Sequence, residues 1–214
     1  GIAIGYKLLS KGIIDGFASA GNTGAIFVGA MSTIKSIPGI LRPAIAACYP
    51  TLNGKSNLIL DVGLNPDCKP DVLYQFGVLG SIYYHFVNKV DSPKVGLLNI
   101  GKEEGKGNLE TKSAYELMKD NKEFNFIGNV EGNDIYDYDK VDVVVTDGFA
   151  GNIVIKQAES FYSIVKERNI SDKYLDRYNF EHYGGTPVLG VNGNIVIGHG
   201  ISNDQAICNM ILQT

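Results

Sequence analysis

Five short apolar segments of this 214-residue chain each run directly into a loop of glycine, asparagine and ionisable or hydroxyl side chains. Because their apolar residues are nearly continuous, these segments are typical of strands buried on both faces of a parallel sheet. The carboxyl ends of parallel strands meet at one edge, where open α/β folds bind their ligands. The pattern therefore predicts a polar crevice along that edge. The segments are FASAGNTGA (17–25), LILDVGLN (58–65), VGLLNIGKEEGKGN (95–108), VDVVVTDGFAGN (141–152) and NIVIGHG (194–200).

Stretches with helical periodicity separate the strands, which predicts a mainly parallel, doubly wound α/β sheet in a single domain over residues 1–214. An Asn192-Gly193 pair between two apolar runs predicts a hairpin near the end of the chain. Residues 169–183 show no clear period and receive no assignment. Helices are expected at about 1–11, 24–34, 70–89, 110–121, 152–168 and 202–213.

Composition narrows the functional classes. A formal net charge of −4 leaves no basic surface of the kind that binds nucleic acid. Cys48, Cys68 and Cys208 lack metal-type spacing and cannot all pair, which favours a reducing compartment. No apolar run reaches the roughly 18–20 residues that cross a bilayer, and no secretory signal opens the chain. These features predict a soluble cytoplasmic protein, with peripheral membrane contact left open.

The first polar loop, AGNTGA (20–25), opens a predicted helix and so offers free backbone amides to an anion. Ser19, Asn22 and Thr23 would add side-chain hydrogen bonds to that anion. The alternative is a tight turn in which Asn22 or Thr23 only caps the helix. The sequence leaves both interpretations open.

Two further loops place a carboxylate just past a buried strand. Asp61, followed by Asn65, is expected either to brace its own loop or to orient a lysine or accept a proton. Asp147 and Asn152 lead into a helix whose first amides would point at a bound anion, although Asn152 could be no more than a cap. Lys156 lies one turn further and could face either the site or solvent.

The segment GKEEGKGN (101–108) has the most reactive composition. Lys102 and Lys106 lie four residues apart beside two glutamates, and a lysine there could meet phosphate or a developing oxyanion. The alternative is a solvated surface loop. Lys106 is favoured because its flanking glycines let the loop fold inward, whereas Lys102 is expected to be exposed. Asn99 and Asn108, at the two ends of the loop, complete the binding candidates.

His199 follows an apolar strand and lies between two glycines, which favours a place in the crevice over a structural role, unlike His85 and His182. The sequence has no GxSxG, CxxC, HExxH or Walker A motif, which argues against a serine or cysteine acyl-enzyme. Amides, lysines, carboxamides and two acids suit direct attack by a bound oxyanion such as phosphate on an activated carbonyl. Orientation of the reactants and stabilisation of the developing negative charge would then accelerate the reaction.

Eight segments of the sequence together form a recognisable set of motifs: SAGNTGA (19–25), GILRPAIA (39–46), DVGLN (61–65), VGLLNIGKEEGKGN (95–108), GNVEGNDI (128–135), DVVVTDGFAGN (142–152), YGGTPVLGVNG (183–193) and IGHG (197–200). In this order, and over nearly the whole chain, they resemble the phosphate acyltransferase family of bacterial phospholipid synthesis (PlsX). The resemblance implies transfer of a long-chain acyl group from acyl carrier protein to inorganic phosphate. The product is an acyl phosphate, which a membrane glycerol-3-phosphate acyltransferase then uses.

The resemblance also implies a three-layer α/β/α fold similar to phosphotransacetylases and to isocitrate and isopropylmalate dehydrogenases. It implies a homodimer with peripheral membrane association, and no metal or organic cofactor. Carried over by position, Lys106 is the strongest catalytic candidate, with Asp61 and His199 as the others. The substrate-binding candidates are Ser19, Asn22, Thr23, Asn65, Asn99, Asn108, Asp147, Asn152 and Lys156.

The chain departs from the family pattern in three places. About a third of a family chain, including an AxDAMGGD-like loop, would precede position 1. A helical hairpin with an apolar tip is expected to be largely missing near 166–182, with residues absent around 166–172. Leu64 stands where the family usually has alanine.

Four alternative functions compete with the one that this resemblance implies. A dehydrogenase on the same scaffold is disfavoured, because no GxGxxG follows a strand with an acid about twenty residues on. A short-chain phosphotransacetylase-like acyltransferase and a non-catalytic membrane scaffold remain as alternatives. A module that only holds phosphate is the least favoured.

Overall fold

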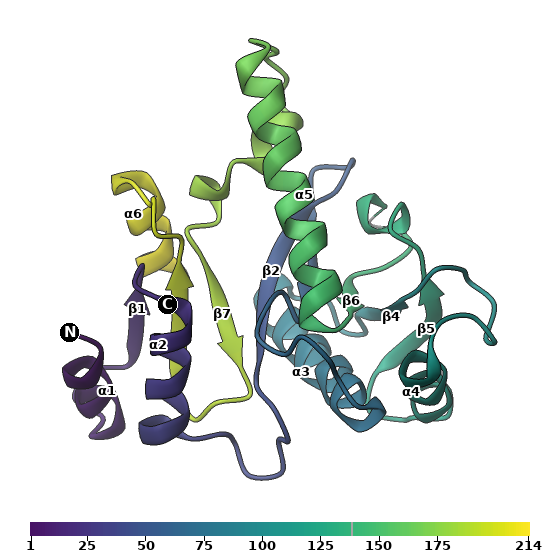
Figure 1. The fold of residues 1–214 in the computed structure, drawn as a ribbon, viewed down its shortest axis with the longest axis horizontal. Coiled ribbons are helices and arrows are strands. Elements are labelled where there is room, and N and C mark those ends of the chain that lie inside the picture. Colours follow the sequence, from purple (N-terminus) through teal and green to yellow (C-terminus); the bar gives the residue numbers. More distant parts are fainter. Residues whose placement is uncertain (138) are drawn as a thin grey trace. The chain divides into compact units, whose positions relative to one another are not determined.

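The computed structural model describes residues 1–137 and 139–214, and the chain forms two compact units (Figure 1). Unit 1 comprises Gly1–Ile45 and Asn179–Thr214, and unit 2 comprises Ala46–Tyr178. Strand β2 (Ala44–Pro50) has its first two residues in unit 1 and the others in unit 2. Among the described residues, four strand pairs are parallel and three are antiparallel. The predicted mainly parallel α/β class is therefore confirmed.

Unit 1 is built on three strands and the start of β2. Strand β1 (Gly16–Ser19) lies parallel to β8 (Asn194–Gly198). Strand β8 is antiparallel to β7 (Gly185–Leu189), which confirms the predicted hairpin, and β7 pairs with the first residues of β2. The helices of this unit are α1 (Ile2–Ser10), α2 (Thr23–Gly29), the π-helix η1 (Ala30–Ile34), the short 3₁₀ helix η4 (Phe180–His182) and α6 (Asp204–Gln213).

Helices cover both faces of this sheet. The ring of Tyr6 in α1 lies 4.6 Å from the ring of Phe17 in β1. The adjacent strand residue, Gly16, instead contacts the side chain of Thr214 at the end of α6. Because successive strand residues point to opposite faces, α1 and α6 lie on opposite sides of the sheet. Unit 1 therefore has three layers.

Unit 2 contains the longer run of parallel strands, in the order β2-β3-β6-β4-β5. Strand β2 pairs antiparallel with β3 (Ser56–Leu60), and β6 (Val143–Val145), β4 (Lys94–Leu98) and β5 (Asn125–Val130) then continue the sheet in parallel. Its helices are α3 (Pro70–Asn88), α4 (Leu109–Lys119), the 3₁₀ helix η2 (Asp134–Tyr136), α5 (Gly148–Glu167) and the 3₁₀ helix η3 (Leu175–Tyr178).

The two faces of the unit 2 sheet are covered by different helices. Gly80 lets α3 pack closely against one face of the sheet, since a Cβ there would lie 2.6 Å from the Val143 side chain and 2.9 Å from the Leu60 side chain. On the opposite face, Ile59 and Val144 are fully buried. They share a cluster with side chains of α5, namely Val154, Ile155 and Ala158. This unit also has three layers.

Helix α5 runs well past the sheet of unit 2 and the chain returns through η3 (Figure 1). The return segment is anchored on the β2–β3 hairpin by polar contacts. Tyr174 donates from its hydroxyl to the Pro50 carbonyl at 3.4 Å, and its hydroxyl lies 2.8 Å from that of Tyr178. Arg177 donates to the carbonyl oxygens of Thr51 (2.9 Å) and Lys55.

Most expected helices are present within a few residues, and the differences have local causes. The helix expected over 24–34 is α2 followed by the π-helix η1. The helix expected from 152 already begins at Gly148, because Asp147 caps it. The unassigned stretch 169–183 contains two short 3₁₀ helices. Within the described ranges, no helix is both long and apolar enough to cross a membrane.

Candidate functional site

The register of the parallel strands brings four polar loops to one edge of unit 2. Leu60 and Leu97 both pair with Val145, and Leu98 pairs with Val130. The residues that follow these strands therefore leave the sheet from the same edge. They begin the loops at Asp61, Asn99, Glu131 and Thr146.

Asp61 is fully buried and braces its own loop. Its Oδ2 accepts hydrogen bonds from the backbone N–H groups of Leu64 (3.1 Å) and Asn65 (2.6 Å). The side-chain amide of Asn65, itself buried, donates to the same oxygen at 2.9 Å. These contacts favour the loop-bracing alternative for Asp61 and give Asn65 a share in it.

The N-terminus of α5 is seated against this loop. A Cβ at Gly148 would lie 2.8 Å from Asp61 Oδ2, and a Cβ at Gly151 would overlap the Asp61 carbonyl oxygen. The Gly148 N–H donates to the Asn65 carbonyl at 2.7 Å. Two glycines are thus required for the close approach of helix and loop.

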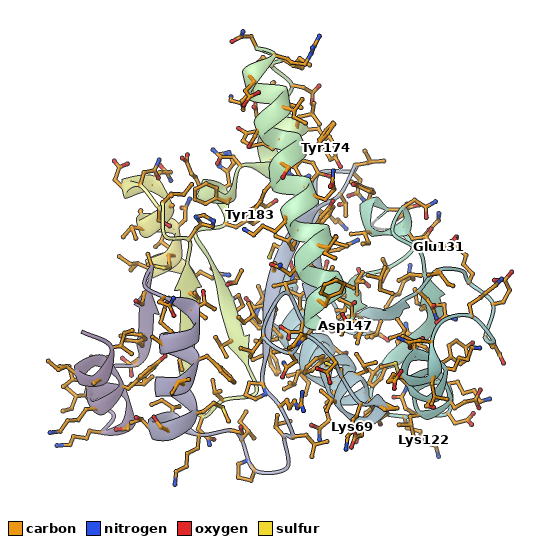
Figure 2. All side chains as sticks on the ribbon, viewed as in Figure 1. Lys69, Lys122, Glu131, Asp147, Tyr174 and Tyr183 are labelled. Carbon is orange, nitrogen blue, oxygen red and sulfur yellow. The ribbon has the colours of Figure 1, made fainter. Side chains whose placement is uncertain are left out.

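The remaining candidates on α5 have distinct environments. Asp147, at the N-terminal end of the helix in Figure 2, accepts from the Ala150 N–H at 2.7 Å and is its cap. Asn152 is exposed and lies beside Gly63, whose Cβ would be 3.5 Å from Asn152 Oδ1. Lys156 pairs with Glu159 at 2.7 Å on the helix surface. Asn152 therefore borders the Asp61 loop, whereas Lys156 is held by a neighbour on its own helix.

The glycine-rich loop folds back onto the ends of β4 and β5. Asn99 donates from its Nδ2 to the carbonyl of Lys106 at 3.1 Å and to Oδ1 of Asn129 at 3.1 Å. Asn129 in turn donates to the carbonyl of Glu103 at 2.9 Å. At the far end, Asn108 caps α4 by accepting from the Thr111 N–H at 2.8 Å.

The two lysines of this loop have different surroundings. Lys106 is exposed, and its ammonium forms no ion pair within 4.0 Å among the residues that the structure describes. Lys102 is also exposed, as expected, but it lies 3.1 Å from Oδ1 of the buried Asp134. Of the two, Lys106 is the cation left available to an anionic ligand.

Asp134 is a charged anchor that sequence reasoning missed. Its side chain is 2% exposed, and its Oδ1 forms ion pairs with the ammonium groups of both Lys102 and Lys140, the latter at 2.9 Å. Burial on its own raises the pKa of this carboxyl. Hydrogen bonds from Lys140, the Glu131 N–H and Lys102 outweigh burial and hold the pKa below its ordinary value. A charged Asp134 therefore ties the glycine-rich loop to the segment after β5.

The unit 1 candidates also gather at one strand edge. Ser19 pairs with Ile197 in the parallel β1–β8 ladder, so the loops that follow leave from the same edge. The Ser19 hydroxyl accepts from the Gly21 N–H at 3.2 Å, and Asn22 caps α2 by accepting from the Ala25 N–H at 3.0 Å. Both side chains are thus used locally, and Thr23 is exposed in the first turn of α2.

His199 is exposed at the end of β8. Its ring lies 5.1 Å from the Phe180 ring, and its Nδ1 accepts from the Ile201 N–H at 3.4 Å. Its carbonyl accepts from the Ser202 hydroxyl at 2.6 Å. The imidazole is therefore held on one side and open on the other.

Within unit 2, the structure joins the Asp61 loop to the start of α5, and Asn99 to the backbone of Lys106. Within unit 1, it places His199 and the Ser19–Thr23 loop on one edge. Asn129 and Asp134 were missed as site residues although both lie in GNVEGNDI, a strand-end segment like the others. Among the described residues, no cluster of three or more His, Cys, Asp or Glu side chains has an arrangement that could hold a metal ion.

A family model described as "Fatty acid synthesis protein" matches residues 1–214. A phosphate acyltransferase from Thermoanaerobacterium thermosaccharolyticum is 43% identical over 231 residues, covering 99% of this chain and 68% of the relative. One from Acidobacterium capsulatum is 44% identical over 227 residues, covering 97% of this chain and 66% of the relative.

The chain belongs to the phosphate acyltransferase family.

The family predicted from the motifs is thereby confirmed, and with it the acyltransferase class. This phosphate acyltransferase family chain spans about two thirds of the length of the relatives it matches. The first alignment extends over 231 residues whereas the chain has 214, so that relative carries residues which this chain lacks. In this chain, α5 ends at Glu167, and a turn through Asn169 (φ 54°) leads toward η3.

Solved structures confirm the fold of this family member. The EutD phosphotransacetylase from Staphylococcus aureus aligns with a TM-score of 0.68 at 17% identity, over 100% of this chain and 66% of that one. A branched-chain phosphotransacylase from Enterococcus faecalis aligns with a TM-score of 0.66 at 13% identity, over 99% of this chain and 78% of that one. The expected likeness to phosphotransacetylases therefore holds for the fold.

Proposed function

We propose that this chain transfers a long-chain acyl group from acyl carrier protein to inorganic phosphate and forms an acyl phosphate for phospholipid synthesis. Membership of the phosphate acyltransferase family supports the reaction class. The observation that carries the assignment of the site is the exposed Lys106 ammonium, held in a folded glycine-rich loop at the carboxyl edge of four parallel strands.

The proposed step needs no covalent enzyme intermediate. An oxygen of hydrogen phosphate attacks the thioester carbonyl carbon, the C–S bond breaks, and the proton of the phosphate ends on the carrier thiol. Negative charge develops on the carbonyl oxygen during attack, and the Lys106 ammonium would stabilise that charge or hold the phosphate. The positive end of the α5 helix dipole, next to Asn152, would add to anion binding.

The other candidates support this centre in different ways. Asp61 and Asn65 would act by fixing the loop on which α5 rests, rather than by touching substrate. His199, in unit 1, stays a candidate catalytic residue. Ser19, Asn22, Thr23, Asn99, Asn108, Asp147 and Lys156 stay candidates for substrate binding.

The partners follow from the reaction. We propose acyl carrier protein as donor, phosphate as acceptor and a homodimer as the working form. The acyl phosphate would pass to a membrane glycerol-3-phosphate acyltransferase. Since that consumer lies in a membrane, we propose a cytoplasmic protein with peripheral membrane association.

Phosphate-dependent release of thiol from acyl carrier protein by the full-length protein tests this function. Lys106→Ala should lower turnover by at least about 100-fold while the protein stays folded, as expected for loss of a group that stabilises the oxyanion. Lys122→Ala is the matched control, because Lys122 is an exposed lysine at the opposite, amino end of β5. Near-normal turnover of Lys106→Ala would remove this lysine from the mechanism.

The choice of donor separates the proposal from its alternatives. Thiol release from acetyl-CoA but not from the acyl carrier thioester would indicate a short-chain phosphotransacetylase-like enzyme. Absence of release from either donor, together with binding to vesicles, would indicate a non-catalytic membrane scaffold.

A further inference from the structure

A buried carboxamide, that of Asn129 at the end of β5, serves the glycine-rich loop rather than the sheet. Asn129 is 6% exposed. Its Oδ1 accepts from Asn99 at 3.1 Å, and its Nδ2 donates to the Glu103 carbonyl at 2.9 Å. Backbone pairing of Asn129 with Leu97 is independent of this side chain. Both side-chain contacts therefore end on the loop and its base.

Asn99 extends the connection to Lys106. A carboxamide nitrogen has two hydrogens, and Asn99 directs one to Asn129 and the other to the Lys106 carbonyl at 3.1 Å. Its Oδ1 accepts from the Ile100 N–H at 2.9 Å, which fixes the orientation of the amide. A continuous chain of hydrogen bonds thus runs from β5 through Asn99 to the backbone of Lys106.

The loop is shaped to receive this amide. Gly107 has a φ of 95°, and a Cβ at that position would lie 2.6 Å from Asn99 Oδ1. Only glycine allows both that dihedral angle and that approach. The position of the Lys106 backbone therefore depends on three parts at once: the end of β4, the end of β5 and the turn at Gly107.

We propose that Asn129 is a positioning residue, which sets the conformation of loop 99–108 and so the place of the Lys106 ammonium. The inference rests on the proposed role of Lys106 toward phosphate. Without the Asn129 carboxamide, Asn99 loses its orienting partner and the Glu103 carbonyl loses its donor. The loop then samples other conformations while the parallel ladder of β5 stays intact.

Limited proteolysis with a lysine-specific protease tests the conformational part without any need for activity. Asn129→Ala should be cut after Lys102 and Lys106 about tenfold faster than the wild-type protein, because local opening of the loop exposes these bonds. Cleavage at the other lysines should stay unchanged. Asn125→Ala is the matched control, since Asn125 is an exposed asparagine at the other end of the same strand.

Steady-state kinetics with the same variants test the functional part. For Asn129→Ala, the KM for phosphate should rise by about 10- to 100-fold, the range typical when a partner that orients a ligand-binding group is removed. The KM for the acyl donor should stay within about twofold. A merely structural role would lower the melting temperature and the active fraction without this split between the two substrates.

Asn129→Asp is the second variant, in case the alanine protein does not fold. It keeps an acceptor for Asn99 but sets a carboxylate oxygen, in place of a donor, against the Glu103 carbonyl, so both effects should be in the same direction and at least as large. Wild-type cleavage rates after Lys102 and Lys106 would overturn the inference whatever the activity. Faster cleavage with an unchanged KM for phosphate would overturn it as well. Failure of the proposed function would instead show as no phosphate-dependent thiol release by the wild-type protein, and failure of the proposed role of Lys106 as full turnover of Lys106→Ala.

Discussion

Replacement of Asp61 tests whether its carboxylate holds the loop in place or takes part in catalysis. One oxygen of Asp61 accepts three N–H groups, two of them from the buried Asn65. In Asp61→Ala all three donors lose this acceptor, and each buried donor left without one costs about 1–2 kcal/mol. The loss should therefore be about 3–6 kcal/mol, a large part of a typical free energy of unfolding of roughly 5–15 kcal/mol.

Asp61→Asn is the informative partner of that variant. An asparagine oxygen can take the place of Oδ2, but hydrogen bonds to a neutral acceptor are weaker than those to a charged one. We expect a loss of about 1–2 kcal/mol in urea unfolding and a turnover within about tenfold of the wild type. The loss of a true general base typically lowers the rate by about 10²- to 10⁴-fold. A fall of that size in Asp61→Asn, with unchanged unfolding, would refute the brace.

Two further predictions concern unit 2. Gly151→Ala should shift the start of α5, because the new Cβ overlaps backbone at Asp61, and should destabilise the protein by about 1–3 kcal/mol in urea unfolding. Gly132→Ala, where a Cβ meets nothing within 4 Å, is its control, and equal stability of the two variants would contradict the close approach. Burial raises the pKa of Asp142, offset only in part by the Lys94 N–H at 2.7 Å. A raised folded pKa means that the carboxylate destabilises the fold increasingly as the pH rises above its ordinary value of about 3.8. Asp142→Asn should therefore raise the melting temperature at pH 7, and an unchanged value would count against this reading.

The strand-end loops could be predicted because each one follows a short apolar run in the sequence. The close contact of α5 with the Asp61 loop could not, since it depends on Gly148 and Gly151 meeting a loop more than eighty residues earlier. The ion pair of Lys102 with Asp134 has the same origin, because the partners are 32 residues apart and only the parallel register brings their loops together. Lys106 was expected on a loop that folds inward. The backbone does fold back onto Asn99, but the side chain stays exposed.

Candidate residues with short side chains were the hardest to assign. Asn22, Asn108 and Asp147 all cap helices at the ends of polar loops, which is what the same residue types do in ordinary turns. A cap and a ligand contact have the same sequence signature, since both place a polar side chain at a helix N-terminus. Asn129 was overlooked because its contacts are to the backbone of a distant loop, and a single sequence carries no signal for such contacts.

The anchoring of η3 bears on how this part of the molecule tolerates change. The segment after α5 is held on the β2–β3 hairpin by Tyr174 and Arg177. The start of α5, where Figure 2 labels Asp147, is fixed against the Asp61 loop. The turn between the end of α5 at Glu167 and Tyr174 can be lengthened at small entropic cost, because loop closure depends only weakly on length. Residues added at that turn would therefore leave the contacts at the start of α5 unchanged.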